Sequence, residues 1–475
     1  MKRRAAVAIL LLLAAGGCTV GPKYKRPTVP LPTEYRAVIS AGQAQSIADL
    51  PWVDLFKDPE LSALIREAID QNLDLQLALA RVEEFRARAR FARANLGPDT
   101  AGSFSVNPSP SGNAIDNSYS LGFVFNWEID VFGKLRRASE ASRAELLASE
   151  DGARAVMSSL VSDVAQTWLE LKALDEERII IQRTITSQEA SLELVRKLSR
   201  AGVASGAEEQ QALNQLATTR SQLPAIEQQI IQTENALSVL LGRHPGAITR
   251  TDRVPEFPSA PVIPAGLPAQ LLERRPDIRF AENQLHAATA RIGVARASRF
   301  PFPTIGLTSF LGSLSTELDD LFTGKDRGEG IISWGPAINW PLFDSGRGRA
   351  SVGVARSQAE QAAVSYRSTI LRALQETADA LATIQKAREQ ITEHEIRVAA
   401  AREVLRLTHL RYRAGVVSYI EILDAQRQLF SAEVDLVRSR RAELVGIVQL
   451  YRALGGGWSD DELRRLIGKP TMTAK

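Results

Sequence analysis

Apolar and polar residues alternate with a period of two in four parts of the chain, as in β-strands whose two faces meet different surroundings. These predicted strands span residues 100–107, 119–127, 303–311 and 332–340. Turn-forming residues fill the two connections between them, which we expect to be polar loops at 107–118 and 312–330. The pattern therefore predicts two strand–loop–strand segments.

Large aromatic residues occupy the apolar positions of these segments. Strands of about ten residues with apolar alternation and aromatic ends are typical of transmembrane β-strands, although a soluble β-hairpin shows the same alternation. We predict a membrane aromatic belt made of Tyr119, Phe123, Phe125, Trp127, Trp334 and Trp340. Four strands cannot close a barrel, and open edges in lipid leave backbone groups unsatisfied, so several copies of the chain must join.

Two runs of helix-favouring sequence follow the strand segments without a proline. They span 134–200 and 347–413, and 67 residues at about 1.5 Å each give a rod on the order of 100 Å. Each run ends at a glycine, Gly202 or Gly415, and a returning helix follows. The first returning helix has apolar residues seven apart, at Leu216, Leu223, Ile230 and Leu237, which favours a coiled-coil hairpin.

Two further helical features stand in the first half of the chain. An earlier helix is predicted from about Pro59 to Asn95, ending before Gly97 and Pro98. Pro224 lies inside the returning helix, where we expect a bend because proline lacks the N–H group and clashes with the preceding turn.

The chain contains an internal duplication. Residues 74–242 return as 277–455, and Trp127 with Gly133 recurs 213 positions later as Trp340 with Gly346. The second copy gains ten residues within its strand–loop–strand segment. A repeat of this length is a domain-sized unit, so the architecture is built in pairs. We expect a first repeat at 59–242, a linker at 243–267, a second repeat at 268–455 and a C-terminal tail at 456–475.

The first residues have the layout of a bacterial secretory signal. Three cations precede an apolar run that closes with small residues before Cys18, which predicts a signal peptide at 1–17. The same layout resembles a lipobox, in which the cysteine is acylated; an ordinary signal cleaved nearby is the alternative. Thr19 in place of Asp favours the outer membrane. The proline-rich segment after Cys18 predicts a lipidated tether at 18–58.

Charge and residue content exclude several classes of function. Without residues 1–17 the chain has 55 basic and 55 acidic residues, so it lacks the basic surplus of a nucleic-acid-binding protein. Cys18 is the only cysteine, which excludes an intramolecular disulfide. The four histidines show no metal-ligand spacing, and no nucleotide-binding or hydrolase motif is present. We expect neither an enzyme nor a cofactor.

One acidic pair stands just past the second tip glycine. Glu421 and Asp424 are three residues apart on one helix face, whereas the first copy has Glu208 and Gln211 at the equivalent positions. Such a pair is commonly a solvated face or a partner of the helix dipole. Where symmetric copies converge on an axis, however, it becomes a ring of carboxylates that attracts cations and controls passage.

Five segments resemble the TolC-like outer-membrane factors, in particular the lipoprotein branch with OprM-like and NodT-like channels. They read CTVGPKYKRP, WVDLFKDPEL, LLERRPDI, ARIGVARA and GPAINWPLFDSG, at 18–27, 52–61, 271–278, 290–297 and 335–346. The resemblance implies a mixed, mainly α fold with internal duplication. It implies a homotrimer whose four strands per protomer form an outer-membrane β-barrel, continued by a long α-helical coiled-coil barrel in the periplasm.

The same resemblance implies partners and site residues. It implies outer-membrane lipid, an inner-membrane pump of the RND type and a periplasmic membrane-fusion adaptor that docks on the tips, at Gly202, Val203, Gly415 and Val416. The constriction acids of the family fall on Glu421 and Asp424. Val417 stands where a basic residue is often found, which removes one side of a salt bridge between protomers at the gate.

These observations predict a passive exit duct for a tripartite efflux system, gated at the helical tips. Two alternatives remain: the exit duct of a type I protein secretion system, and a periplasmic coiled-coil adaptor lipoprotein without a pore. The alternating aromatic strands favour a duct, because an adaptor has no reason to carry them. The sequence does not identify the substrates of the duct.

Overall fold

The computed structural model describes residues 19–30, 52, 58–111, 114–250, 271–299, 301–319, 321 and 329–467. The predictions for the signal peptide, for Cys18, for most of the tether and linker and for the last eight residues lie outside these ranges. None of the described helices is both long enough and apolar enough to cross a membrane.

The elements recur in the same order in the two halves of the chain. The first half contains α3 (Pro59–Gln71), α4 (Leu73–Ala94), β1 (Asp99–Ser111), β2 (Ala114–Ile129), α5 (Lys134–Arg200) and α6 (Gly206–Leu240). The second contains α7 (Leu271–Arg274), α8 (Pro276–Ala297), β3 (Thr304–Ser315), β4 (Glu329–Asn339), α10 (Arg347–Arg413) and α11 (Tyr419–Ala453), followed by α12 (Asp460–Ile467). Both long helices have the predicted bounds. The helix α6 continues through Pro224, and the bend expected there stays a prediction.

The prediction of a single helix from Pro59 to Asn95 is wrong, because Asn72 separates α3 from α4. This residue has extended backbone angles, φ −61° and ψ 130°. Its side-chain oxygen accepts a hydrogen bond from the Leu75 N–H, and its Nδ2 donates to the Leu240 carbonyl at 2.9 Å. A short polar side chain that satisfies free backbone groups in this way favours a cap over a helix interior.

The loop expected at 107–118 is also wrong, because β1 and β2 continue through most of it. Pairing extends through Pro108 with Asn117 to Ser111 with Ala114. The prolines suggested a loop, but proline is tolerated in an edge strand, where its missing N–H would face away from the ladder. In the second half, the longer connection lies between the end of β3 and the start of β4, as expected.

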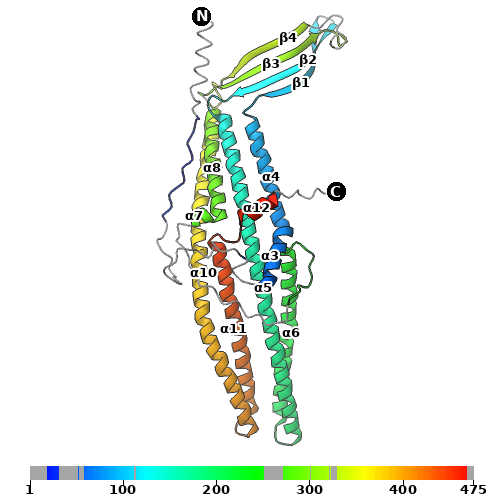
Figure 1. Ribbon diagram of the computed structural model, residues 1–475, viewed down its shortest axis with the longest axis vertical. Helices are drawn as coiled ribbons and strands as arrows, with labels where there is room; N and C mark the ends of the chain where they lie inside the picture. The colour runs from blue at the N-terminus through cyan, green and yellow to red at the C-terminus, as the bar shows by residue number, and fades with distance from the viewer. Residues whose placement is uncertain are drawn as a thin grey trace. The chain divides into compact units, whose positions relative to one another are not determined.

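The four strands form one antiparallel sheet in the order β1-β2-β3-β4 (Figure 1). Directly paired residues share a face, so the register determines which side chains lie together. One face carries Phe104, Val106, Tyr119, Leu121, Phe123, Phe125, Trp127, Ile305, Leu307, Leu311, Ile332, Trp334 and Ile338. We call this set the apolar face. Trp340 follows β4 directly.

The opposite face of the sheet carries mainly small and polar residues. Ser105 and Ser120 pair across β1 and β2 with their hydroxyl oxygens 2.7 Å apart. Gly122 and Gly312 pair across β2 and β3, and the Phe310 ring lies over both. A Cβ on Gly122 would stand 2.6 Å from the Gly312 Cα, so neither position has room for a side chain. The two faces therefore differ strongly in polarity.

The chain divides into two compact units that do not follow the duplication. One, here the sheet unit, comprises the described residues within 1–29, 80–151 and 279–369; the other, the tip unit, comprises those within 30–79, 152–278 and 370–475. Each unit takes segments from both halves of the chain. The two copies follow one another in the sequence, but in the structure each unit contains elements from both copies.

The duplication is visible in how the returning helices end. Asn72 donates to the Leu240 carbonyl at the end of α6, and Arg275, two residues before Asp277 as Asn72 is before Asp74, donates to the Ala453 carbonyl of α11, each at 2.9 Å. Gly242 and Gly455 follow these ends with φ of +72° and +87°. Their missing side chains leave room for the backbone before α4 and α8.

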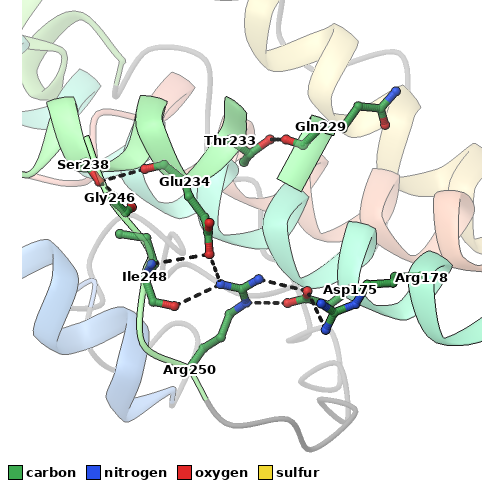
Figure 2. Close-up of polar contacts among 9 residues, drawn as sticks. All are labelled: Asp175, Arg178, Gln229, Thr233, Glu234, Ser238, Gly246, Ile248 and Arg250. Atoms are coloured by element: carbon green, nitrogen blue, oxygen red, sulfur yellow. Dashed lines mark hydrogen bonds and ion pairs between the residues drawn. The ribbon is translucent and has the colours of Figure 1, made fainter. Parts of the chain in front are cut away.

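An arginine clamp holds the chain after α6 against two helices (Figure 2). The Arg250 guanidinium lies between Asp175 of α5 and Glu234 of α6, and its side chain is 12% exposed. It donates to Asp175 Oδ1 at 3.0 Å and to the Ile248 carbonyl at 2.9 Å. These two carboxylates hold the pKa of Arg250 above its usual range. The segment before residue 251 therefore crosslinks α5 and α6.

We expect Arg250→Met to lower the free energy of unfolding by about 2 kcal/mol, because two largely buried carboxylates lose their common cation. Urea unfolding followed by circular dichroism measures this. Arg220→Met is the control: its pair with Glu189 is about half exposed on both sides, and its loss should cost less than about 0.5 kcal/mol. An equal loss in the two variants would contradict the clamp.

Candidate functional site

Each of the two helical hairpins in the tip unit turns at a glycine. Gly202 and Gly415 have φ of +74° and +73°, in the left-handed region that favours glycine. The next residues, Val203 and Val416, donate back to the carbonyls of Leu198 and Arg411 at 2.9 and 3.0 Å, which closes a Schellman motif at the end of each long helix. Both valines are exposed, at 75% and 65%. The predicted docking residues thus lie in two equivalent turns with exposed apolar side chains.

A hydrophobic cluster joins the two hairpins just behind these turns. We call it the tip cluster, and its buried members are Leu192, Val195, Ala212, Leu216, Tyr419, Ile422 and Leu423. They come from α5, α6 and α11, and Leu405 and Tyr412 of α10 pack against them. The start of α11 is therefore anchored on the first hairpin.

Polar contacts accompany the tip cluster. The Tyr412 hydroxyl donates to Glu208 Oε2 at 3.5 Å, and the Tyr412 and Tyr419 rings meet edge-on with centroids 5.6 Å apart. Gln426 Nε2 donates to the Ser191 hydroxyl at 3.3 Å. Burial raises the pKa of Tyr419 to about 12, so this phenol keeps its proton at physiological pH.

The predicted gate acids lie on the opposite face of α11 from the tip cluster. Tyr419, Ile422 and Leu423 are buried, whereas Glu421 and Asp424 are about half exposed. Each acid has an arginine of the second hairpin beside it: Glu421 Oε2 lies 3.9 Å from Arg411, and Asp424 pairs with Arg427. The charge at this tip is therefore mixed, which the acidic pair alone did not indicate.

The two copies differ in how the returning helix begins. Ser205 accepts a hydrogen bond from the Glu208 N–H at 3.3 Å and caps α6, while the equivalent Ser418 makes no side-chain cap on α11. Glu208 contacts Tyr412 of the other hairpin, whereas its counterpart Glu421 points away from the tip cluster. Only the second copy presents two acids on an exposed face.

Several of these residues were not recognised in the sequence. Tyr412 and Tyr419 are seven apart across a glycine turn, a spacing that indicates a shared face only once the hairpin is known. Ser191 and Gln426 come from different halves of the chain, and no local pattern connects them. Within the described ranges, no group of three or more histidine, cysteine or acidic residues could hold a metal ion.

The predicted belt residues lie in the sheet unit. Tyr119, Phe123, Phe125, Trp127 and Trp334 all belong to the apolar face. Trp127 is 37% exposed, and its Nε1 donates to the Leu96 carbonyl at 3.1 Å. An exposed ring with a satisfied polar end is the arrangement of tryptophan at a membrane interface.

Comparison with known proteins agrees with this architecture. The profile of the family described as outer membrane efflux protein matches residues 64–243 and 267–456. The solvent efflux pump outer membrane protein SrpC of Pseudomonas putida is 37% identical over 468 residues, covering 94% of this chain and 97% of SrpC. The cation efflux system protein CusC of Escherichia coli O6:H1 is 35% identical over 455 residues, with the same coverage of both chains.

Solved structures show the same fold. The outer-membrane channel OprN superposes with a TM-score of 0.86 at 30% identity, covering 93% of this chain and all of OprN. This likeness over almost the whole chain confirms the predicted mainly α fold with four strands per chain. Because the family profile covers most of the chain and relatives above 30% identity span it almost completely, the protein belongs to the outer membrane efflux protein family.

Proposed function

We propose that three copies of this chain form one outer-membrane duct, with the apolar face of each sheet in contact with lipid. The observation that carries the proposal is the sheet itself, which has one apolar face and ends in the strands β1 and β4 on either side. Strand edges in lipid leave N–H and C=O groups without partners, at a cost of several kcal/mol each. Pairing β4 of one copy with β1 of the next satisfies both edges and closes twelve strands.

The tip unit supports a second part of the proposal, a periplasmic tunnel made of helices. Each copy contributes the hairpins α5–α6 and α10–α11, so three copies supply a wall of helices. We infer that a periplasmic membrane-fusion adaptor docks on the turns at Gly202, Val203, Gly415 and Val416, and that an RND-type pump in the inner membrane delivers the cargo. Exposed Val203 and Val416 support this, since apolar side chains at a tip favour a protein partner.

A lipid anchor at Cys18 completes the attachment to the outer membrane. Its support is the lipobox-like sequence before Cys18 and the described segment that follows it. Several acyl chains together hold a protein firmly, since each buried CH2 contributes roughly 0.8 kcal/mol.

The duct acts passively and is not an enzyme. Its relatives are efflux channels, and a similar fraction of identical residues links the chain to proteins named for solvents and for cations. We infer that the pump and adaptor select the cargo and that the wall of the duct passes it. A type I secretion duct would need the same barrel; the named efflux systems among the relatives favour efflux of small molecules. Membership of an outer-membrane family removes the alternative of a pore-free adaptor.

Glu421 and Asp424 are the proposed gate residues. Three copies place six carboxylates around the axis if the exposed face of α11 turns inward, and such a ring attracts cations. Arg411 and Arg427 lie beside these acids and reduce the field that they generate. The gate is therefore an array of ion pairs in which removal of an arginine and removal of an acid have opposite effects.

The duct is tested by placing a charge on either face of β2. We expect Phe123→Arg to reduce the heat-modifiable trimer in outer-membrane fractions, because arginine facing lipid costs about 2–4 kcal/mol near the midplane. Asn126→Arg, on the opposite face, should assemble and alter single-channel conductance in planar bilayers instead. A wild-type protein without conductance, or equal loss of trimer in both variants, would overturn the duct.

The gate is tested by channel block with hexamminecobalt(III). We expect Glu421→Gln with Asp424→Asn to weaken block about tenfold, equivalent to about 1.4 kcal/mol, and Arg427→Gln to strengthen it. Glu193→Gln, an exposed acid on α5, serves as the control and should leave block unchanged. Unchanged channel block in the double variant would contradict the assignment of Glu421 and Asp424 to the gate.

A further inference from the structure

The described residues that follow Cys18, at the start of the predicted tether, pack tightly on the sheet unit. We call Thr19–Arg26 the strap; it is dark blue in Figure 1. Thr19 to Pro22 and Tyr24 are partly buried, while Lys23 and Lys25 are exposed. This alternation shows that one side of an extended segment faces the protein.

The first half of the strap lies against the backbone of α8 and of the turn that precedes α5. The Val20 N–H donates to the Phe132 carbonyl at 3.1 Å, directly before α5. Gly21 has φ +106°, and a Cβ there would stand 2.5 Å from the Gly293 Cα of α8. A Cβ on Gly293 would in turn stand 2.7 Å from the Val20 carbonyl oxygen. Both glycines are therefore required by a close approach of strap and α8.

This approach brings together two of the segments on which the family resemblance rests. Gly21 belongs to CTVGPKYKRP and Gly293 to ARIGVARA, which are far apart in the chain. Arg137 of α5, whose side chain is 4% exposed, lies against the same place and pairs with Glu140. The contact explains why glycine stands at both positions.

The second half of the strap is held by charge and stacking. Arg26 donates from Nε and Nη2 to the two carboxylate oxygens of Glu282, each at 2.7 Å, and the Tyr24 hydroxyl donates to the same carboxylate at 3.1 Å. The Tyr24 ring stacks on His286 with centroids 4.7 Å apart. His286 Nε2 lies 3.1 Å from Glu140 Oε1, which connects α8 to α5 beneath the strap.

We propose that the strap is a fixed seat for the membrane anchor. The Cα of Cys18 is one peptide, about 3.8 Å, from that of Thr19, and Thr19 lies against Gly133 at the junction of β2 and α5. The strap therefore fixes the attachment point of the acyl chains at the end of the sheet, next to Gly133. This inference rests on the proposed lipid anchor.

The strap also links the two halves of the chain. Its contacts are with α5 from the first copy and α8 from the second, and Glu282 is 256 residues from Arg26. The strap can seat only after these helices have packed together. An anchored but unfolded chain therefore has an open strap, and seating it accompanies completion of the sheet unit.

The test follows release of the anchor by trypsin from open outer-membrane fragments, accessible from both faces, that contain palmitate-labelled, full-length protein. Cleavage after Lys23 or Lys25 frees a short labelled peptide from an open strap. Wild-type protein should release its label slowly. The Glu282→Ala variant should release it roughly tenfold faster, because it loses hydrogen bonds between charged groups. Gly21→Val should lose it at least as fast.

Glu145→Ala is the matched control, because it removes the Arg291 pair between the same two helices without touching the strap. It should release label at the wild-type rate. The proposed role of the strap would be overturned if Glu282→Ala released label at the same rate as wild type or as Glu145→Ala. Failure to incorporate palmitate would contradict the lipid anchor alone, and mass spectrometry of peptides ending at Lys23 and Lys25 would then measure the same protection.

Discussion

Backbone hydrogen bonding in lipid is the constraint on which the rest of this structure depends. The sheet of one chain has an apolar face suited to hydrocarbon, but its outer strands β1 and β4 have no further neighbour among the described strands. Lipid offers no hydrogen bonds to such edges. A single copy is therefore incomplete in the membrane. Association through the edges and closure of the proposed barrel both follow from satisfying those groups.

The duplication supplies the parts for the proposed assembly, but the two copies are not equivalent. Both copies build two strands, a helix of 67 residues and a returning helix of 35. At the tips, however, Glu208 contacts the neighbouring hairpin, whereas Glu421 and Asp424 face outward beside Arg411 and Arg427. Arg250 fastens the first hairpin to the chain that follows it. The first tip is thus braced by contacts within the protomer, and the second presents exposed, paired charges.

Local patterns predicted the elements well where one strong signal acted alone. The helices α5 and α10 have the expected bounds because no proline interrupts them. The prolines near position 108 led to the wrong prediction of a loop, because an outer strand tolerates proline. Asn72 interrupted a predicted helix because it caps α4 and donates to a carbonyl 168 residues away. The strap, the Arg250 clamp and the tip cluster depend on pairs distant in sequence. No periodicity along the chain reports such pairs, so the sequence indicated the acidic pair Glu421 and Asp424 but not its arginine partners.

Disulfide crosslinking between copies tests the central claim most directly, because the anchor cysteine is the only one in the chain. One cysteine is placed in β1, at Phe104, and a second is scanned along β4 from Ile332 to Ile338, with oxidation in intact outer membranes. The account predicts covalent dimers and trimers at one register, with no further species. Monomers at every register would show that the edges of β1 and β4 do not meet, and would contradict the closed barrel.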